Sequence, residues 1–317
     1  MKAAALKLDK TLIRREFWEN RSLWMVPAVA AGILTVLSVY ALIAILLHNQ
    51  QVNNVDVNGM HFQIDEMPDL SNSDDADLTS FVRFGTLSLG ALFNFLMQIV
   101  VFFYLLDSLY AERRDRSVLF WRSMPVSDVR TVLSKLATAC IANSAITFVV
   151  TIAFQLVLLV LLMVLGASVG AHPWLLLAHP GAFLGAWLLL AYGLIVQTIW
   201  YLPFYGWILL ASSWAKKVPF LWAILVPLGV MFAELWVFHT GKFAHMLLAY
   251  KMRWMGLAFN LDPLHFGNLK HLDLSGSIMG FGNIGALVTS PSLWIGLAVA
   301  AGFTYGAIWL RRKRSEI

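Results

Sequence analysis

The sequence has few charged residues and almost no cysteine. Of its 317 residues, 13% are charged and 59% are hydrophobic, and the mean hydropathy is +0.72. Soluble domains are about half apolar and about a quarter charged, so this composition excludes an ordinary soluble domain. The single cysteine, Cys140, lies inside an apolar run, which excludes a disulfide framework and a metal cluster built on thiolates. The composition therefore indicates an integral membrane protein.

Signatures of several enzyme classes are also missing. The chain has no Gly-x-x-x-x-Gly-Lys-Ser/Thr phosphate loop, so we do not expect it to hydrolyse ATP. It has no His-Glu-x-x-His metal motif and no serine in a Gly-x-Ser-x-Gly-like context. The eight histidines fall in loops or at the ends of apolar runs, which argues against an intramembrane protease. We therefore expect neither catalytic nor metal-binding residues in this chain.

Six apolar runs are long enough to cross a bilayer, which takes roughly 20 residues. The predicted spans cover residues 23–47, 84–107, 136–165, 182–211, 218–238 and 293–310. The first run is too long for a signal peptide and is not followed by a small-residue cleavage site, so we expect it to stay as an anchor. The fourth run contains Pro203, and we expect one long span that is kinked or tilted there.

The distribution of Lys and Arg predicts the orientation of these spans. Basic residues gather at the N-terminus, between spans two and three, at Lys216-Lys217 and in the C-terminal tail, whereas loop 48–83 is acidic. Short cytoplasmic loops are enriched in Lys and Arg, so both termini are expected in the cytoplasm, with the protein in the cell's inner (plasma) membrane. Loop 240–291 also holds four basic residues and fits less well, but long loops are weak topology signals.

The predicted fold is an all-α integral membrane protein with a single transmembrane domain over residues 1–317. Residues 1–22 are expected to form an amphipathic interfacial helix, because apolar residues alternate with Lys and Arg at near-helical spacing. An ordinary basic flank is the other interpretation. Loops 48–83 and 240–291 are expected on the outer face. Residues 243–259 predict one or two short helices there.

The segment 108–127 carries the most specific pattern. Charged residues alternate with Phe120 and Trp121, and Pro125 is expected to end a short helix. Ser127 or Asp128 can cap the next helix. A solvated basic loop explains the arginines, but it does not explain Glu112 together with the aromatic residues.

This segment resembles the coupling helix of permease subunits of type 2 ABC exporters (the ABC-2 family). Glu112, Arg113, Ser117, Met124-Pro125-Val126-Ser127 and Lys135 occupy places in the family pattern, whereas Arg116 stands where glycine is usual. Residues 202–207 and 214–220 also look like this family. The resemblance covers nearly the whole chain, but only the coupling segment is moderately specific.

The resemblance implies a permease coupled to a separate ABC ATPase subunit, which would bind ATP and Mg. Contacts with that subunit are then expected from Glu112, Arg113, Arg114, Asp115, Arg116, Phe120 and Trp121. It further implies export and a second permease copy, as a homodimer or with a close relative. Membrane lipids are expected partners, and nucleic acid is not. Glu112→Lys or deletion of 117–121 is expected to uncouple transport while leaving expression intact.

Polar residues also lie inside the predicted spans. They recur about every four residues and so share one helix face: Asn94, Gln98, Asn143, Thr147, Thr151 and Gln155. Two interpretations are open, namely hydrogen bonding between helices and lining of a translocation path. Glu234 is the one acid well inside the fifth predicted span, and it is a further candidate for the path.

Two other function classes compete with the permease. An ion-coupled transporter usually buries charges at mid-membrane and often has inverted repeats, and neither is evident in the sequence. A membrane scaffold or sensor that transports nothing is the other alternative. Co-purification with an ATPase would separate these classes.

Overall fold

The computed structural model describes residues 2–48, 54–57, 60–63, 75–115, 126–169, 180–259 and 284–313. Its helices are α1 (Lys2–Glu19), α2 (Ser22–His48), α3 (Asp75–Arg114), α5 (Asp128–Ile141), α6 (Thr147–Val169), α8 (Pro180–Trp200), α9 (Leu202–Trp214), α10 (Pro219–Phe238), α11 (Lys242–Phe259), α12 (Ile284–Thr289) and α13 (Pro291–Lys313). A π-helical turn, Ala142–Ile146, joins α5 to α6. Two short strands, β1 (Asn54–Val57) and β2 (Met60–Gln63), pair in antiparallel fashion, with Asn54 opposite Gln63.

Six helical segments in the described residues are long and apolar enough to cross a membrane. They are Ser22–Leu47, Thr79–Arg114, Asp128–Ser168, Pro180–Trp200, Pro219–Phe238 and Pro291–Lys313. The helical architecture and the count of six agree with the prediction from the sequence. The hairpin β1–β2 in the first loop was not predicted, although Asn58-Gly59 between the strands is a common hairpin signal.

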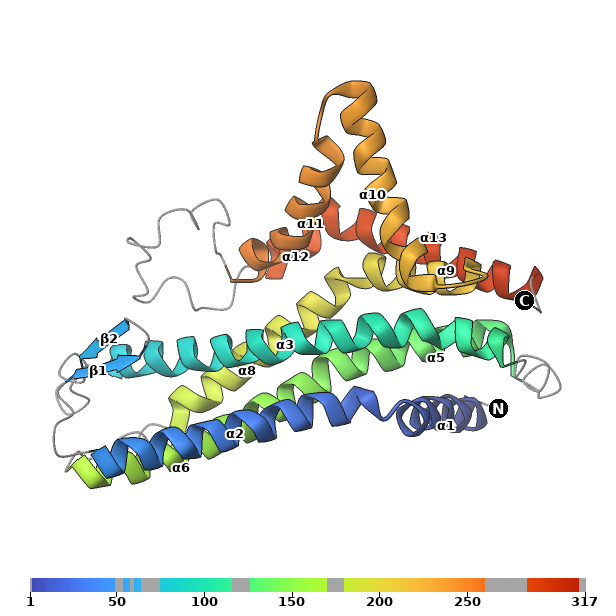
Figure 1. Ribbon diagram of the computed structural model, residues 1–317. Coiled ribbons are helices and arrows are strands. Elements are labelled where there is room, and N and C mark those ends of the chain that lie inside the picture. The colour runs from blue at the N-terminus through green and yellow to red at the C-terminus, as the bar shows by residue number, and fades with distance from the viewer. Residues whose placement is uncertain are drawn as a thin grey trace.

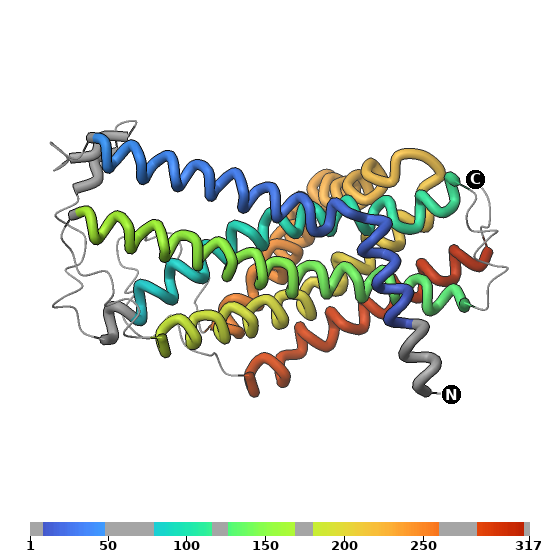
Figure 2. The backbone as a smooth tube through the Cα atoms, turned by 90° about the horizontal axis from the view of Figure 1, so that it is seen from below, coloured from blue at the N-terminus to red at the C-terminus, as the bar shows by residue number. Residues whose placement is uncertain are grey.

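The helices form an elongated bundle from which one helical hairpin projects (Figure 1). Helices α2, α3, α5 and α6 run along the bundle, α8 crosses it, and α9 lies beside α13. Helices α10 and α11 form the hairpin that points away from the rest. Figure 2 shows α1 turned steeply away from the axis of α2, and both chain termini lie at the same end of the bundle in the two views.

The fourth apolar run is broken into two helices. Helix α8 ends at Trp200 and α9 begins at Leu202, so the predicted single span 182–211 does not continue through this point. Pro203 is the second residue of α9. It has no N–H to donate to the carbonyl oxygen four residues earlier, so it cannot continue the hydrogen bonding of α8. The chain therefore changes direction two residues before the proline, and not at a kink within one helix.

Contacts with α11 hold the end of α8 in place at this break. The Trp200 indole donates to the Tyr250 carbonyl at 2.8 Å, and the Tyr250 hydroxyl donates to the Trp200 carbonyl at 3.3 Å. The two rings stack with their centroids 5.1 Å apart. Burial raises the pKa of the Tyr250 hydroxyl to about 12.

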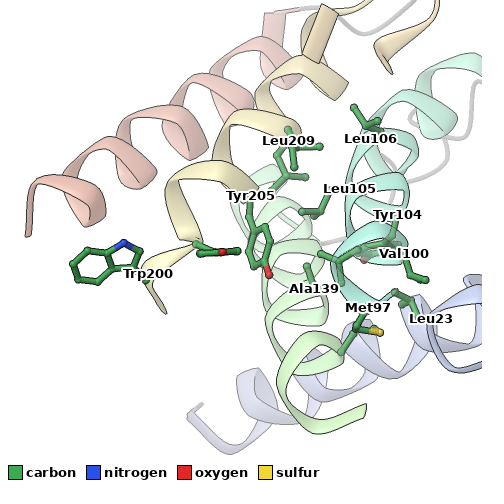
Figure 3. Close-up of a cluster of buried hydrophobic side chains, with 14 of the residues drawn as sticks. Leu23, Met97, Val100, Tyr104, Leu105, Leu106, Ala139, Trp200, Tyr205 and Leu209 are labelled. Carbon is green, nitrogen blue, oxygen red and sulfur yellow. The ribbon is translucent and has the colours of Figure 1, made fainter. Parts of the chain in front are cut away.

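The core lies where α2, α3, α5, α8 and α9 meet. Figure 3 shows Met97 and Leu105 of α3 and Tyr205 and Leu209 of α9 in one apolar cluster. Leu23, at the start of α2, is also fully buried in this cluster. Because lipid tails are as apolar as leucine, close packing and hydrogen bonds between helices stabilise such a core more than the removal of apolar surface from water.

Helix α9 packs closely against α13 at Gly206. A Cβ atom at this position would lie 3.1 Å from the Ala300 carbonyl oxygen and 3.2 Å from the Phe303 Cβ. We expect Gly206→Leu to lower the free energy of unfolding by roughly 1–3 kcal/mol, because the added side chain forces the helices apart. Thermal unfolding of the detergent-solubilised protein measures this. Gly229→Leu in α10, where a Cβ meets nothing within 4 Å, is the matched control and should have little effect.

Candidate functional site

A cluster of buried charges joins four helix ends at the end of the bundle where the termini lie. It consists of Glu16 on α1, Glu112 on α3, Asp128 and Lys135 on α5, and Arg311 on α13, and is called the ion cluster below. The Lys135 ammonium lies 3.0 Å from both the Glu16 and Glu112 carboxylates. Arg311 pairs with Glu112 and also contacts Asp128 at 3.0 Å.

Four of the five members of the ion cluster are almost inaccessible to solvent, whereas the Asp128 side chain is 24% exposed. Glu16, Lys135, Arg311 and Glu112 expose between 1% and 8% of their surface. Arg15 lies 3.0 Å from Glu16, so three cations face three carboxylates. A buried charge is costly unless opposite charges and hydrogen bonds compensate it, and this cluster provides both. The four helix ends are therefore tied to one another.

A hydroxyl of the core extends the ion cluster. Tyr104 of α3 donates to the second carboxylate oxygen of Glu16 at 3.0 Å. Leu12 lies one helical turn before Glu16 and is also buried, so both occupy the inward face of α1. Helix α1 is thus held against the bundle by its own charged residue.

Arg113 ties α3 to the end of α9. Its guanidinium donates to the carbonyl oxygens of Ser212 and Ala215, at 2.5 Å and 2.9 Å. The last carbonyls of a helix lack partners within the helix and carry partial negative charge, so a cation is favourable there. The Ser212 hydroxyl in turn donates to the Leu106 carbonyl at 2.6 Å and connects the two helices a turn earlier.

The structure separates the residues that the sequence grouped as ATPase contacts. Glu112 and Arg113 are buried among residues of the same chain. Arg114 and Asp115 are more than half exposed and pair with each other at 3.0 Å. Arg116, Phe120 and Trp121 lie outside the described residues. Within the described part of segment 108–127, the charged side chains on the surface near its end are therefore those of Arg114 and Asp115.

Polar side chains of three predicted spans meet near the middle of the bundle. The Gln98 amide donates to Asn143 at 3.0 Å, and the Asn143 amide donates to the Thr198 hydroxyl at 3.0 Å. The Tyr205 hydroxyl donates to Gln98 at 3.2 Å. Asn143 lies in the π-helical turn, an irregularity that often occurs at functional sites.

A second polar contact lies farther along the same helix pair. The Gln155 amide donates to the Thr86 hydroxyl at 2.7 Å, and the Trp187 indole donates to Gln155 at 3.0 Å. Since Gln98 faces Asn143 and Thr86 faces Gln155, the antiparallel register places Asn94 opposite Thr147. These two residues, like Thr151, are buried. Among the described residues, then, the predicted polar face packs between helices of one chain.

Glu234 lies apart from the other polar residues, near the end of α10. Its carboxylate accepts the backbone N–H groups of Lys242 and Phe243, both at 2.8 Å, and the Thr240 hydroxyl at 2.8 Å. A carboxylate at the start of a helix satisfies unpaired N–H groups and the helix dipole. Here Glu234 caps α11.

Sequence reasoning missed three residues of the ion cluster and its surroundings. Glu16 is an acid on the apolar face of the first amphipathic helix, and this position is a usable signal for a buried ion pair. Asp128 was considered only as a possible helix cap. The cap is instead Ser127, whose hydroxyl accepts the Arg130 N–H. Arg311 was counted only as part of the basic tail. Its buried position depends on α13 packing beside α9 and α5.

The long apolar helices, with their charged clusters at the helix ends, define a multi-pass membrane protein. Within the described ranges, no group of three or more His, Cys, Asp or Glu side chains could hold a metal ion. Comparison of the chain with protein-family models, curated proteins and solved structures finds no match.

Proposed function

We propose that this chain is the permease subunit of an ATP-driven ABC transporter of the ABC-2 type, and that it works as an exporter. A separate ABC ATPase subunit binds ATP and Mg and hydrolyses the nucleotide. The chain sits in the inner (plasma) membrane with both termini in the cytoplasm. The observation that carries the proposal is the ion cluster beside segment 108–127.

The ion cluster lies at the base of this segment. Glu112 lies three residues before position 115, where the described part of this segment ends, and Asp128 lies two residues after position 126, where the description resumes, and both residues belong to the cluster. Breaking a buried ion pair by removing one partner costs about 3–5 kcal/mol. A displacement of the segment therefore moves the ends of α1, α3, α5 and α13 together, as coupling to an ATPase requires.

In the described part of the segment, two charged residues are exposed and two are buried, as coupling to a partner subunit requires. The exposed Arg114 and Asp115 provide charges to a partner surface, whereas Glu112 and Arg113 connect the segment to the bundle. A solvated loop needs no such anchoring. The interface residues in this proposal are Arg114 and Asp115, and Arg116, Phe120 and Trp121 remain expected contacts.

We further propose that two copies form the translocation path between them. The polar residues of the predicted spans bond to one another inside one chain, so they provide no open path in a single copy. Few residues of α10 are buried in the apolar part of this helix, which leaves its surface for lipid or for a second copy. Both features favour a path at a subunit interface.

The ion-coupled transporter is the weaker alternative. Such proteins usually bury charged residues at mid-membrane for the coupling ion. Here the hydrogen-bonded groups near the middle of α3 and in the π-helical turn before α6 are neutral amides and hydroxyls, such as Gln98 and Asn143. The buried charges of the ion cluster lie at the helix ends. A membrane scaffold or sensor would not need this coupling between four helices.

The test is stimulation of ATP hydrolysis by the permease. We expect the full chain to co-purify with an ABC ATPase and to stimulate its ATP hydrolysis in lipid nanodiscs. The double variant Arg114→Glu/Asp115→Lys should lower the affinity of the two subunits about tenfold. Lys313→Glu, an exposed charge reversal at the same end of the bundle, is the matched control.

Three results bear on this proposal. Failure to recruit any ATPase, or ATP hydrolysis that does not respond to the permease, contradicts the function itself. Equal losses in the double variant and in Lys313→Glu contradict the assignment of Arg114 and Asp115 to the interface. A loss confined to the double variant supports both.

A further inference from the structure

An open groove of about 410 Å³ lies at the end of the bundle that holds the ion cluster. It is bounded by the junction of α1 and α2, the last turns of α3 and the start of α10. The lining residues are Asn20, Ser22, Phe103, Tyr104, Leu106, Asp107, Tyr110, Pro219 and Phe220. Because three candidate spans begin or end here, the groove lies at the depth of the lipid head groups.

The walls of the groove are largely aromatic. The Phe103 and Phe220 rings lie nearly parallel, at 7°, with centroids 6.2 Å apart, and about half of each side chain is exposed. The Arg114 guanidinium already lies 5.8 Å from the centroid of the Tyr110 ring. Aromatic faces attract cations, and lysine, arginine and quaternary ammonium groups all bind to them. The groove thus offers surfaces for both an acyl chain and an ammonium group.

Asp107 places a carboxylate among these rings. It is exposed, and within the described part of the chain it forms no hydrogen bond or ion pair. The Arg114 guanidinium, seven residues farther along α3, interacts electrostatically with the Asp107 carboxylate. A carboxylate in an aromatic groove at the membrane surface has the charge that an ammonium group complements.

Basic residues adjoin the groove in the sequence. Arg21 stands between the lining residues Asn20 and Ser22, and Lys216-Lys217 precede Pro219 by two residues. All three basic residues are exposed. Cations near the membrane surface attract lipid phosphates. Asp107 in the lining and the basic residues next to the lining in the sequence therefore supply the two charges that a zwitterionic head group complements.

We propose that this groove binds a zwitterionic phospholipid whose head group ends in an ammonium. The ammonium lies against Asp107, the phosphate lies toward the basic residues around Arg21 and Lys217, and an acyl chain lies along Phe103 and Phe220. An anionic phospholipid without an ammonium group would place negative charge near Asp107 and binds less well. This lipid site does not depend on the chain being an ABC permease.

Native mass spectrometry of the purified full chain tests the site directly. The protein is incubated with equal amounts of phosphatidylethanolamine and phosphatidylglycerol that carry identical acyl chains. We expect the wild-type protein to retain more phosphatidylethanolamine. Asp107→Asn should lower the retained ratio of the two lipids by up to about fivefold, the upper end of the range for an exposed ion pair. Phe220→Ala should lower the retention of both lipids.

Asp115→Asn is the matched control, since Asp115 is an exposed acid on the same helix end outside the groove. It should leave the ratio unchanged. An unchanged ratio in Asp107→Asn overturns the proposal, and so does an equal fall in Asp115→Asn. Asp107 is exposed and the substitution is nearly isosteric, so thermal unfolding should match the wild type. Because the assay contains no ATPase, its failure is distinguishable from failure of the proposed function.

Discussion

Replacing Glu112 with lysine is expected to lower the free energy of unfolding by about 3–5 kcal/mol, the cost of breaking a buried ion pair. In the folded protein, the new ammonium would face Lys135 and Arg311 in place of a carboxylate. The low exposure of Glu112, 8%, leaves water little access to screen the three cations. Unfolding of the detergent-solubilised protein, followed by tryptophan fluorescence against temperature or denaturant, measures the loss.

Two further variants test this interpretation of Glu112. Asp115→Lys makes the same charge change three residues later on an exposed site, and should cost less than about 0.5 kcal/mol. The exchange Glu112→Lys/Lys135→Glu restores opposite charges in this one pair but sets like charges against Glu16 and Arg311, so it should recover little of the lost stability. If Glu112→Lys proves as stable as Asp115→Lys, the ion cluster does not hold the helix ends together.

Burial of Glu112 changes what this substitution can reveal about transport. From the sequence, Glu112→Lys was expected to uncouple transport while leaving expression intact. The structure indicates instead that a lysine at this position damages the folded bundle, because the carboxylate contacts α5 and α13. Uncoupling is better tested at the exposed pair Arg114 and Asp115.

Asn143→Leu is expected to lower the free energy of unfolding by roughly 1–3 kcal/mol, the cost of leaving a buried polar partner unsatisfied. The substitution removes the acceptor of the Gln98 amide and the donor to the Thr198 hydroxyl at once. Single hydrogen bonds between helices in membranes average about 0.6 kcal/mol, so the larger value depends on the loss of two bonds. The same unfolding assay measures it.

Thr151→Val is the matched control on the same helix face. The Thr151 hydroxyl donates only to the Thr147 carbonyl of its own helix among the described contacts, so its loss should cost less. A double-mutant cycle of Asn143→Leu with Gln98→Leu isolates their coupling. Equal effects of Asn143→Leu and Thr151→Val would contradict the interhelical role. Lost transport with unchanged stability would favour residues that line the path.

Short-range patterns in the sequence predicted the spans and several helix ends. An apolar run of sufficient length must be helical in a bilayer, because only a helix satisfies its own backbone groups there. Six such runs lead to six candidate helices. Ser127 was a predicted cap, and its hydroxyl accepts the Arg130 N–H at the start of α5. Such features depend on residues close together in the chain.

Only the tertiary structure decided which charges meet. Arg311 pairs with Glu112 from 199 residues away, and nothing within either helix selects that partner. Glu112 and Arg113 point in different directions, yet both are buried, because α13 covers one and the end of α9 covers the other. The break after Trp200 likewise depends on Tyr250 of α11. Helical periodicity defines the face on which a side chain lies, whereas the packing of distant helices defines what that face contacts.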